Sequence, residues 1–240
     1  MKNIKLLFYC ALFLLPISLL GQDNRYAPVS KGTLIENTYY CLDYNVEHKQ
    51  PNWVYYMLTQ THIIGKTPRS STFKDCKQGD LESASQKDYK GSGYDKGHLC
   101  PAADMKLSTE AMKETFQMWN MSPQVPSFNR GRWSDLEALV RNYIKTETDT
   151  LFIATGPVFI SSQGSIGDGK VTVPGYYYKV VYSPSRGGIG FLMPNQKISS
   201  KLPSWQISIE LIELLTGIDF FPQLPKYLQA KIESQMTWWE

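Results

Sequence analysis

The order of apolar segments in the second half of the chain constrains its fold most strongly. Apolar residues recur at helical spacing over residues 132–145, which predicts an amphipathic helix. Apolar runs that predict strands follow at residues 150–155, 176–182 and 190–193. These strands do not alternate regularly with helices. The pattern therefore predicts a mixed α+β fold with a mixed or antiparallel central sheet flanked by helices.

The first half of the chain is less regular. Residues 23–50 are polar and aromatic without clear periodicity, whereas residues 52–59 are rich in Trp, Tyr and Val and predict a strand. Residues 65–93 carry Gly, Ser, Lys, Asp and Pro without an apolar period, so we expect a long loop there. A loop of this length inside a compact domain is usually functional or mobile.

Cap residues mark three further helices. They are predicted over residues 107–118, over residues 208–216 and from Pro225 onward. Ser108 or Thr109 would cap the first of these helices, and Gly217 would end the second.

The N-terminus has the layout of a secretory signal peptide. Lys2 and Lys5 precede an apolar run over residues 6–20, and the small residue Gly21 follows it. We therefore expect residues 1–21 to be removed on export, which would make the protein secreted or periplasmic.

A membrane anchor is the alternative interpretation of the same segment. Pro16 and Ser18 interrupt a run that is already short for a hydrocarbon core of ~30 Å, so the signal peptide is favoured. Residues 22–240 would then form one domain with no membrane association.

Net charge does not indicate a partner. The 240-residue chain has 25 Lys+Arg against 22 Asp+Glu, and cleavage would remove Lys2 and Lys5 to leave 23 against 22. A nucleic-acid-binding domain often carries a strong basic excess. Any surface that attracts phosphate must therefore be local.

A histidine-dependent mechanism has few candidates, because histidine occurs only at positions 48, 62 and 98. The first two lie among ordinary polar or strand residues and are interpreted as structural. His98 ends the tetrapeptide Asp95-Lys96-Gly97-His98, which places charge beside it. Gly97 is expected to free the backbone so that the imidazole can take an unusual angle.

Asn129 and Glu137 are candidates for a metal site. An asparagine oxygen suits a hard cation that keeps most of its waters. If both residues lie on one helix, eight residues rise ~12 Å and turn ~80° away from the same face. Glu137 would then hold the water shell of the cation from outside. Taken alone, Asn129 is equally a helix cap and Glu137 an exposed helix residue.

Three motifs in order carry a resemblance to a known family. They are Asp95-Lys96-Gly97-His98, Asn120-x-x-Pro123-Gln124 and Asn129-x-Gly131-x-Trp133-x-x-Leu136-Glu137. Together they resemble the DNA/RNA non-specific endonuclease family, whose members share a ββα-metal active site. The likeness extends to residues 65–69, 155–158, 178–181 and 215–218, and so covers nearly all of the mature chain.

The resemblance implies a role for each matching position. His98 matches the general base of the family, Asn129 its single direct metal ligand and Glu137 a carboxylate outside the ligand shell. Arg69 matches the arginine that contacts the scissile phosphate. Asn120 matches an active-site amide with a positioning role.

Lys96 departs from the family pattern, which has arginine before the glycine. Lysine keeps the charge but loses the planar fork for a phosphate. The resemblance further implies Mg²⁺ as the cofactor, with Mn²⁺ as an alternative, and DNA and RNA as substrates that are cut to 5′-phosphate and 3′-hydroxyl ends. A homodimer is possible but the sequence does not indicate one.

Two other functions compete with this interpretation. Lys96 and the neighbouring Cys100 are compatible with an extracellular nucleic-acid-binding protein that keeps the fold and has lost useful activity. The joint presence of His98, Asn129 and Glu137 argues against such decay. A phosphodiesterase for nucleotides or other small substrates is the second alternative.

Three cysteines remain after cleavage: Cys41, Cys76 and Cys100. Export permits oxidation. Cys100 follows His98 by two residues and Cys76 follows Arg69 by seven, so both segments are expected to converge on one site. A Cys76–Cys100 disulfide is therefore expected, with Cys41 free, and three unpaired thiols are the alternative.

Overall fold

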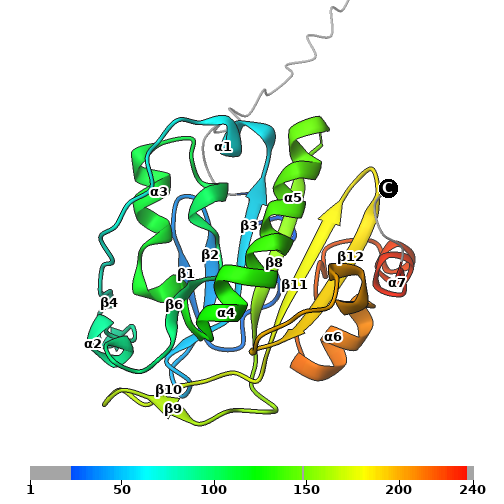
Figure 1. The fold of residues 1–240 in the computed structure, drawn as a ribbon. Helices are drawn as coiled ribbons and strands as arrows, with labels where there is room; N and C mark the ends of the chain where they lie inside the picture. The colour runs from blue at the N-terminus through cyan, green and yellow to red at the C-terminus, as the bar shows by residue number, and fades with distance from the viewer. Residues whose placement is uncertain (1–22, 148, 237–240) are drawn as a thin grey trace, which may run out of the picture.

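A computed structural model of the protein describes residues 23–147 and 149–236. Within these residues, seven strands form one sheet in the order β1-β2-β3-β8-β11-β12-β13 (Figure 1). Its strands are β1 (Thr33–Glu36), β2 (Cys41–Asn45), β3 (Gln50–Leu58), β8 (Leu151–Val158), β11 (Tyr176–Ser183), β12 (Gly187–Pro194) and β13 (Gln206–Ile207). Every neighbouring pair is antiparallel. The predicted α+β fold is confirmed.

The sheet separates two hydrophobic cores, because alternate residues of a strand face opposite sides. In β11, Tyr177 and Val181 belong to one core, whereas Tyr178 and Val180 belong to the other. Both faces of the central strands are apolar and rich in β-branched and aromatic residues. Helices can therefore cover the sheet on both sides.

Helices form the outer layers. They are α1 (Gln60–Ile64), α2 (Gln86–Tyr89), α3 (Thr109–Thr115), α4 (Pro126–Phe128), α5 (Ser134–Thr146), α6 (Ile209–Thr216) and α7 (Lys226–Glu233), with 3-10 turns η1 (Ala102–Asp104), η2 (Met118–Asn120) and η4 (Leu202–Trp205) and a π-turn η3 (Asn129–Trp133). Helices α1, α3 and α5 pack on one face, and α6 and α7 pack on the other (Figure 1).

The predicted caps are present. Ser108 Oγ accepts a hydrogen bond from Ala111 N, and Ser208 Oγ accepts one from Leu211 N. Gly217 ends α6 in the left-handed conformation, with φ of 66°. Helix α5 begins at Ser134, two residues later than the apolar period alone suggests.

Two segments are more ordered than the sequence indicates. Residues 23–50 contain strands β1 and β2, which are too short to show a period. Residues 65–93 contain the pair β4 (Lys77–Gln78) and β5 (Leu81–Glu82) and the one-turn helix α2. Ser85 caps α2 by accepting from Lys87 N, and Asp88 accepts from Ser85 N in return. The expectation of one long irregular loop was therefore wrong.

The expected disulfide is absent, because the three cysteines of the described residues are free thiols. Cys76 and Cys100 do converge on the same core, as predicted. The Cys76 thiol, however, donates to Lys74 O at 3.2 Å, and Cys100 is completely buried. The expected Cys76–Cys100 bond was therefore wrong, although the convergence behind it was right.

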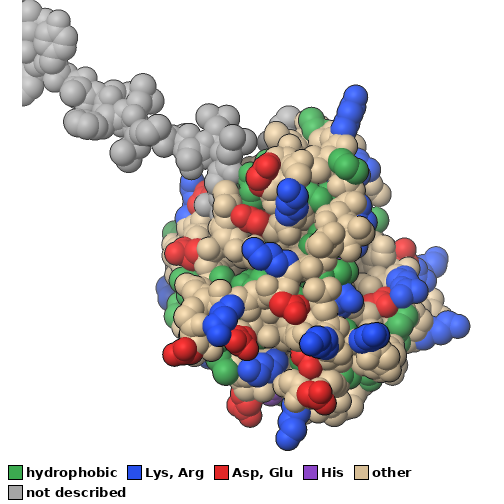
Figure 2. Space-filling view, turned by 90° about the vertical axis from the view of Figure 1, so that its left-hand side faces the viewer, with side chains coloured by type: hydrophobic (Ala, Val, Ile, Leu, Met, Phe, Trp, Pro, Cys, Tyr) green, Lys and Arg blue, Asp and Glu red, His purple; other side chains and the backbone are tan. Residues whose placement is uncertain are grey.

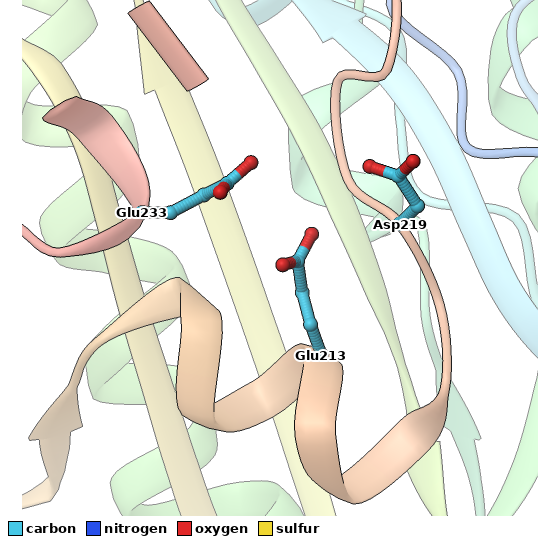
Figure 3. Close-up of side chains that lie close together, drawn as sticks. All are labelled: Glu213, Asp219 and Glu233. Carbon is cyan, nitrogen blue, oxygen red and sulfur yellow. The ribbon is translucent and has the colours of Figure 1, made fainter. Parts of the chain in front are cut away.

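Three acidic side chains gather on the α6–α7 side of the sheet (Figure 3). One carboxylate oxygen from each of Glu213, Asp219 and Glu233 lies within 4.8 Å of the others. Burial raises the pKa of Glu213 to about 7, and the neighbouring acids add to the shift. The cluster lies on α6, on α7 and on the loop between them, Asp219 is exposed, and none of the three acids lines the site described below.

The predicted signal peptide, residues 1–21, lies outside the described residues. Among the residues that are described, no helix has the length and apolar character needed to cross a bilayer.

Candidate active site

A short antiparallel strand pair followed by a helix builds the candidate site. Strand β6 (Asp95–His98) pairs antiparallel with β7 (Met121–Gln124), so that Asp95 lies opposite Gln124 and His98 opposite Met121. Helix α5 follows. A pocket of about 540 Å³ opens beside these elements, and its lining contains five of the six predicted site residues: Arg69, Lys96, His98, Asn129 and Glu137.

Gly97 is needed for a close contact and not for an unusual backbone angle. It lies within β6 and is not among the glycines with positive φ. A Cβ at this position would lie 2.2 Å from Oε1 of Gln124 and 2.3 Å from its Cδ. The bare backbone therefore lets the Gln124 side chain lie across the strand next to His98. The expected reason for Gly97 was wrong, because the glycine makes space and does not supply backbone freedom.

His98 is held in an apolar wall. Its ring lies 4.7 Å from Phe116 and 5.8 Å from Phe73, measured between centroids. Only 8% of the residue is exposed, and its Nε2 has no hydrogen-bond partner among the described residues. Burial, and then the charge of Arg69, lower the pKa of His98 to about 3. The imidazole is therefore neutral near pH 7 and can accept a proton.

Asp95 holds the amide of Asn129. Asn129 Nδ2 donates to Asp95 Oδ2 at 2.9 Å, and Arg130 donates to both oxygens of the same carboxylate at 2.8 and 2.5 Å. With its NH₂ group engaged, the Asn129 amide has Oδ1 available for a cation. Sequence reasoning took Asp95 only as a charge beside His98. The position of Asp95 in the same tetrapeptide as His98 was the indication in the sequence that Asp95 belongs to the site.

Glu137 lies in the first turn of α5, and 15% of its side chain is exposed. Burial raises its pKa to about 7. The positive charges of Lys179, Arg141 and Arg69 oppose this shift, whereas Asp104 adds to it. The carboxylate is therefore close to its titration point near neutral pH.

Asn129 and Glu137 do not share one regular helix. Gly131, with φ of −111° and ψ of −117°, breaks the helical path between them. The condition of a single regular helix considered from the sequence is therefore not met, and both residues line the same pocket.

Two cations flank the histidine by packing on aromatic rings. The Arg69 guanidinium lies 5.1 Å from the centroid of Phe116, and Lys96 Nζ lies 4.6 Å from that of Phe73. Such cation–π contacts orient long side chains that would otherwise be free. Both groups therefore present positive charge at the pocket, and neither forms an ion pair with a carboxylate of the residues that the structure describes.

Asn120 lies outside the pocket lining and is completely buried. Its Oδ1 accepts from Cys100 N at 2.8 Å, and its Nδ2 donates to Cys100 O and to Thr115 O, each at 2.9 Å. It therefore fixes the chain just after His98 through the backbone. Asn120 was expected in the active site, but it lies beneath the pocket lining.

The other two histidines are elsewhere. His48 Nδ1 lies 3.0 Å from Thr172 Oγ1, and the ring stacks on Phe159. His62 Nδ1 lies 2.8 Å from Thr59 Oγ1 at the start of α1. Their structural interpretation agrees with these contacts.

Three charged residues at or near the pocket were not predicted from the sequence: Arg141, which lines the pocket, and the buried Asp104 and Lys179. Arg141 donates to Asp104 at 2.7 Å and lies 4.0 Å from Glu137. Lys179 is completely buried in β11. The spacing of Glu137 and Arg141, one helical turn apart, was the only local signal.

The face of the molecule that Figure 2 shows carries side chains of both charges. Lys and Arg side chains alternate with Asp and Glu over the face that carries α2 and α3 (Figure 2). The pocket instead combines Arg69, Lys96, Arg130 and Arg141 with two carboxylates, Asp95 and Glu137. This arrangement suits an anionic group together with a hard cation.

Comparisons with known proteins agree with this geometry. The family model for DNA/RNA non-specific endonucleases matches residues 23–227. A nuclease from Syncephalastrum racemosum is 34% identical over 237 residues, covering 88% of this chain and 73% of the relative. A nuclease from Nostoc sp. is 33% identical over 239 residues, covering 91% and 85%. The crystal structure of the EndoG/EndoGI complex is similar with a TM-score of 0.74 and 30% identity, covering 81% of this chain and 88% of that chain.

Proposed function

The chain belongs to the DNA/RNA non-specific endonuclease family, and from this membership we propose a secreted, divalent-metal-dependent enzyme that hydrolyses phosphodiester bonds in DNA and RNA with His98 as general base. The observation that carries the proposal is the environment of His98. A neutral imidazole, whose Nε2 has no hydrogen-bond partner in the described part of the chain, lines a pocket that holds cations for a phosphate and oxygen donors for a metal.

His98 would accept the proton of a water molecule as that water attacks phosphorus in line with the leaving 3′-oxygen. Its low pKa keeps the ring unprotonated before attack. The apolar rings of Phe73 and Phe116 fix the plane of the imidazole. The products would carry 5′-phosphate and 3′-hydroxyl ends.

The donor set fits a hard divalent cation. Asn129 Oδ1 would hold it directly, with Asp95 fixing the amide, and Glu137 would act on its water shell. Mg²⁺ is the proposed ion, and Mn²⁺ has the same preference for oxygen donors. When bound, the cation would neutralise charge on the phosphoryl oxygens and on the leaving oxygen.

Arg69 and Lys96 would bind the phosphate. Both side chains line the pocket beside His98, and both are oriented by aromatic rings. Contacts directed at phosphate and sugar carry no base information, which accounts for cleavage without sequence preference.

Residues 1–21 support export, because their order of basic, apolar and small residues is that of a signal peptide. Detection of a chain that starts near Gln22 outside the cytoplasm would test this part of the proposal.

One assay separates the proposed function from its alternatives. A chain starting at Gln22 is incubated with supercoiled plasmid, with RNA and with a small aryl phosphodiester, each with Mg²⁺ and with Mg²⁺ plus chelator. We expect cleavage of both polymers that stops with chelator. Binding without cleavage would instead identify an inactive binding protein. Cleavage of the small diester alone would identify a phosphodiesterase.

A further inference from the structure

Lys179 is a buried lysine that the proposed mechanism does not use. It lies in the middle of β11, opposite Thr155 of β8 and Phe191 of β12. None of its surface is exposed. By strand alternation its side chain points to the same face as Tyr177 and Val181, which is the face covered by α5.

The ammonium group has no hydrogen-bond partner among the described residues. Two rings surround it: Lys179 Nζ lies 5.1 Å from the ring centroid of Trp133 and 5.8 Å from that of Tyr56. A buried ammonium costs several kcal/mol unless an opposite charge compensates it. The role of Lys179 therefore depends on which acidic residues compensate its charge.

The two rings connect Lys179 to the acidic side of the pocket. Trp133 has helical φ and ψ and precedes Glu137 by one turn of helix. Tyr56 donates to Asp104 Oδ2 at 3.0 Å. The ammonium therefore lies against the residues that carry or precede these acids, and the charges of Glu137 and Asp104 act on it.

Asp104 is already compensated by other groups. It accepts from Tyr56 and, at 2.7 Å, from Arg141. The same Arg141 nitrogen lies 4.0 Å from Glu137, beyond hydrogen-bond distance. Arg141 is thus bonded to Asp104, and Lys179 is the cation acting on Glu137 that is completely buried and has no hydrogen-bonded partner among the described residues.

We propose that Lys179 is a positioning residue for Glu137, whose buried ammonium holds the carboxylate charged and facing the pocket. The inference deepens the proposed function and rests on it for the role of Glu137. This role accounts for a charged residue at position 179. If only packing mattered, an apolar residue of similar size would fill the position at lower cost.

The charges around Glu137 agree with this role. They come from Lys179 on β11, Asp104 on η1, Arg141 on α5 and Arg69 on the loop after α1. Among the groups that lower the pKa of Glu137 against the effect of burial, Lys179 has the largest influence. Glu137 in turn is the largest influence that raises the pKa of Lys179.

A double-mutant cycle on unfolding tests the coupling without substrate or metal. Lys179→Met, Glu137→Gln and the double variant are unfolded in urea at pH 5.5 and pH 8. We expect Lys179→Met to lower the urea midpoint by about 0.5 M more at pH 8, where Glu137 is ionised, than at pH 5.5. This extra loss should vanish in the Glu137→Gln background. An equal extra loss in both backgrounds would overturn the proposal.

Val181→Ala is the matched control, because Val181 is buried on the same strand and the same face. It should lower the midpoint equally at both pH values. If Lys179→Met does not fold alone, the proposal expects it to fold with Glu137→Gln, which removes the uncompensated carboxylate. Failure to fold in both backgrounds would show that Lys179 serves the core and would overturn the proposal.

Plasmid cleavage provides a second readout. Lys179→Met should lower kcat by about 10-fold or more and move the acid side of the pH profile to higher pH, and Lys179→Arg should restore much of both. A drop in kcat with an unchanged profile would contradict the proposal. The double-mutant cycle in urea does not depend on cleavage of any substrate. Failure of the proposed function can therefore be distinguished from failure of this inference.

Discussion

At the scale of single residues, burial favours the neutral forms of His98 and Glu137 in the pocket. His98 has its pKa lowered to about 3 and Glu137 has its pKa raised to about 7. Neutral imidazole is the form a general base needs, whereas the carboxylate needs compensating charge to stay ionised. Histidine chemistry at this position was readable from the tetrapeptide, but the burial that tunes it was not.

His98→Ala should reduce turnover of plasmid DNA by ~10²–10⁴-fold, because it removes the proton acceptor. Nucleic-acid binding should be little changed, since the cations of Arg69 and Lys96 remain. Initial rates and a binding titration in the presence of metal measure the two effects. Near-normal cleavage by the variant would contradict the assignment of the base.

The low pKa of His98 should also appear in stability. Between about pH 6.5 and pH 3 the unfolded chain binds a proton at this residue and the folded chain does not. Folding stability is therefore lost as pH falls through this range, by about 1.4 kcal/mol per pH unit at most. His98→Asn should flatten the fall in the free energy of unfolding between pH 6.5 and pH 5. An unchanged slope would show that His98 titrates normally.

Lys96→Arg should preserve or raise activity, and Lys96→Ala should reduce it, if the lysine supplies charge near the phosphate. Its stacking on Phe73 also suits a guanidinium. Steady-state kinetics of the two variants give the comparison. A large loss with arginine would mean that the pocket is adapted to the shorter ammonium group.

At the scale of elements, the antiparallel pair of β6 and β7 and the start of α5 determine the site. The apolar stripe of α5 was readable, and Leu136, Val140 and Ile144 are indeed buried. The hydrogen bond from Asn129 to Asp95 was not readable, because it joins residues 34 positions apart through tertiary packing. The break at Gly131 was also missed, since glycine tolerates helical and non-helical angles alike.

Gly97→Ala should disrupt the pairing of β6 with β7, because the new Cβ would overlap the Gln124 side chain. We expect a loss of about 1–3 kcal/mol in the free energy of unfolding, together with a loss of activity. Gln124→Ala in the same chain should recover part of the stability by removing the overlapping atoms. Thermal unfolding of the single and double variants measures this. A fully additive effect would show that the two side chains do not interact.

At the scale of the whole molecule, one antiparallel sheet organises everything else. The longest strands and the helices capped by Ser108 and Ser208 were predicted from the sequence. The hairpin of β1 and β2 was not, because strands of four and five residues show too little periodicity. Convergence of Cys76 and Cys100 was predicted correctly and their bond was not, because proximity of segments does not fix the direction of each thiol.

The chain from Gln22 onward should therefore behave as a protein without disulfides. A thiol reagent should detect one accessible cysteine in the folded state, Cys76, and three in urea, because Cys41 and Cys100 are buried. The melting temperature should be the same with and without reductant. A drop in melting temperature on reduction would instead restore the Cys76–Cys100 bond.

The division of the molecule by its sheet has a practical consequence. Everything that forms the pocket lies on the α5 side, whereas α6 and α7 rest on a core of their own. Leu214 and Tyr227 on these two helices are 80% and 78% exposed. A solid support or a fusion partner joined there leaves the opposite face open to long polymers. Helices α6 and α7 are therefore suitable attachment sites for immobilising the enzyme without obstructing its substrate.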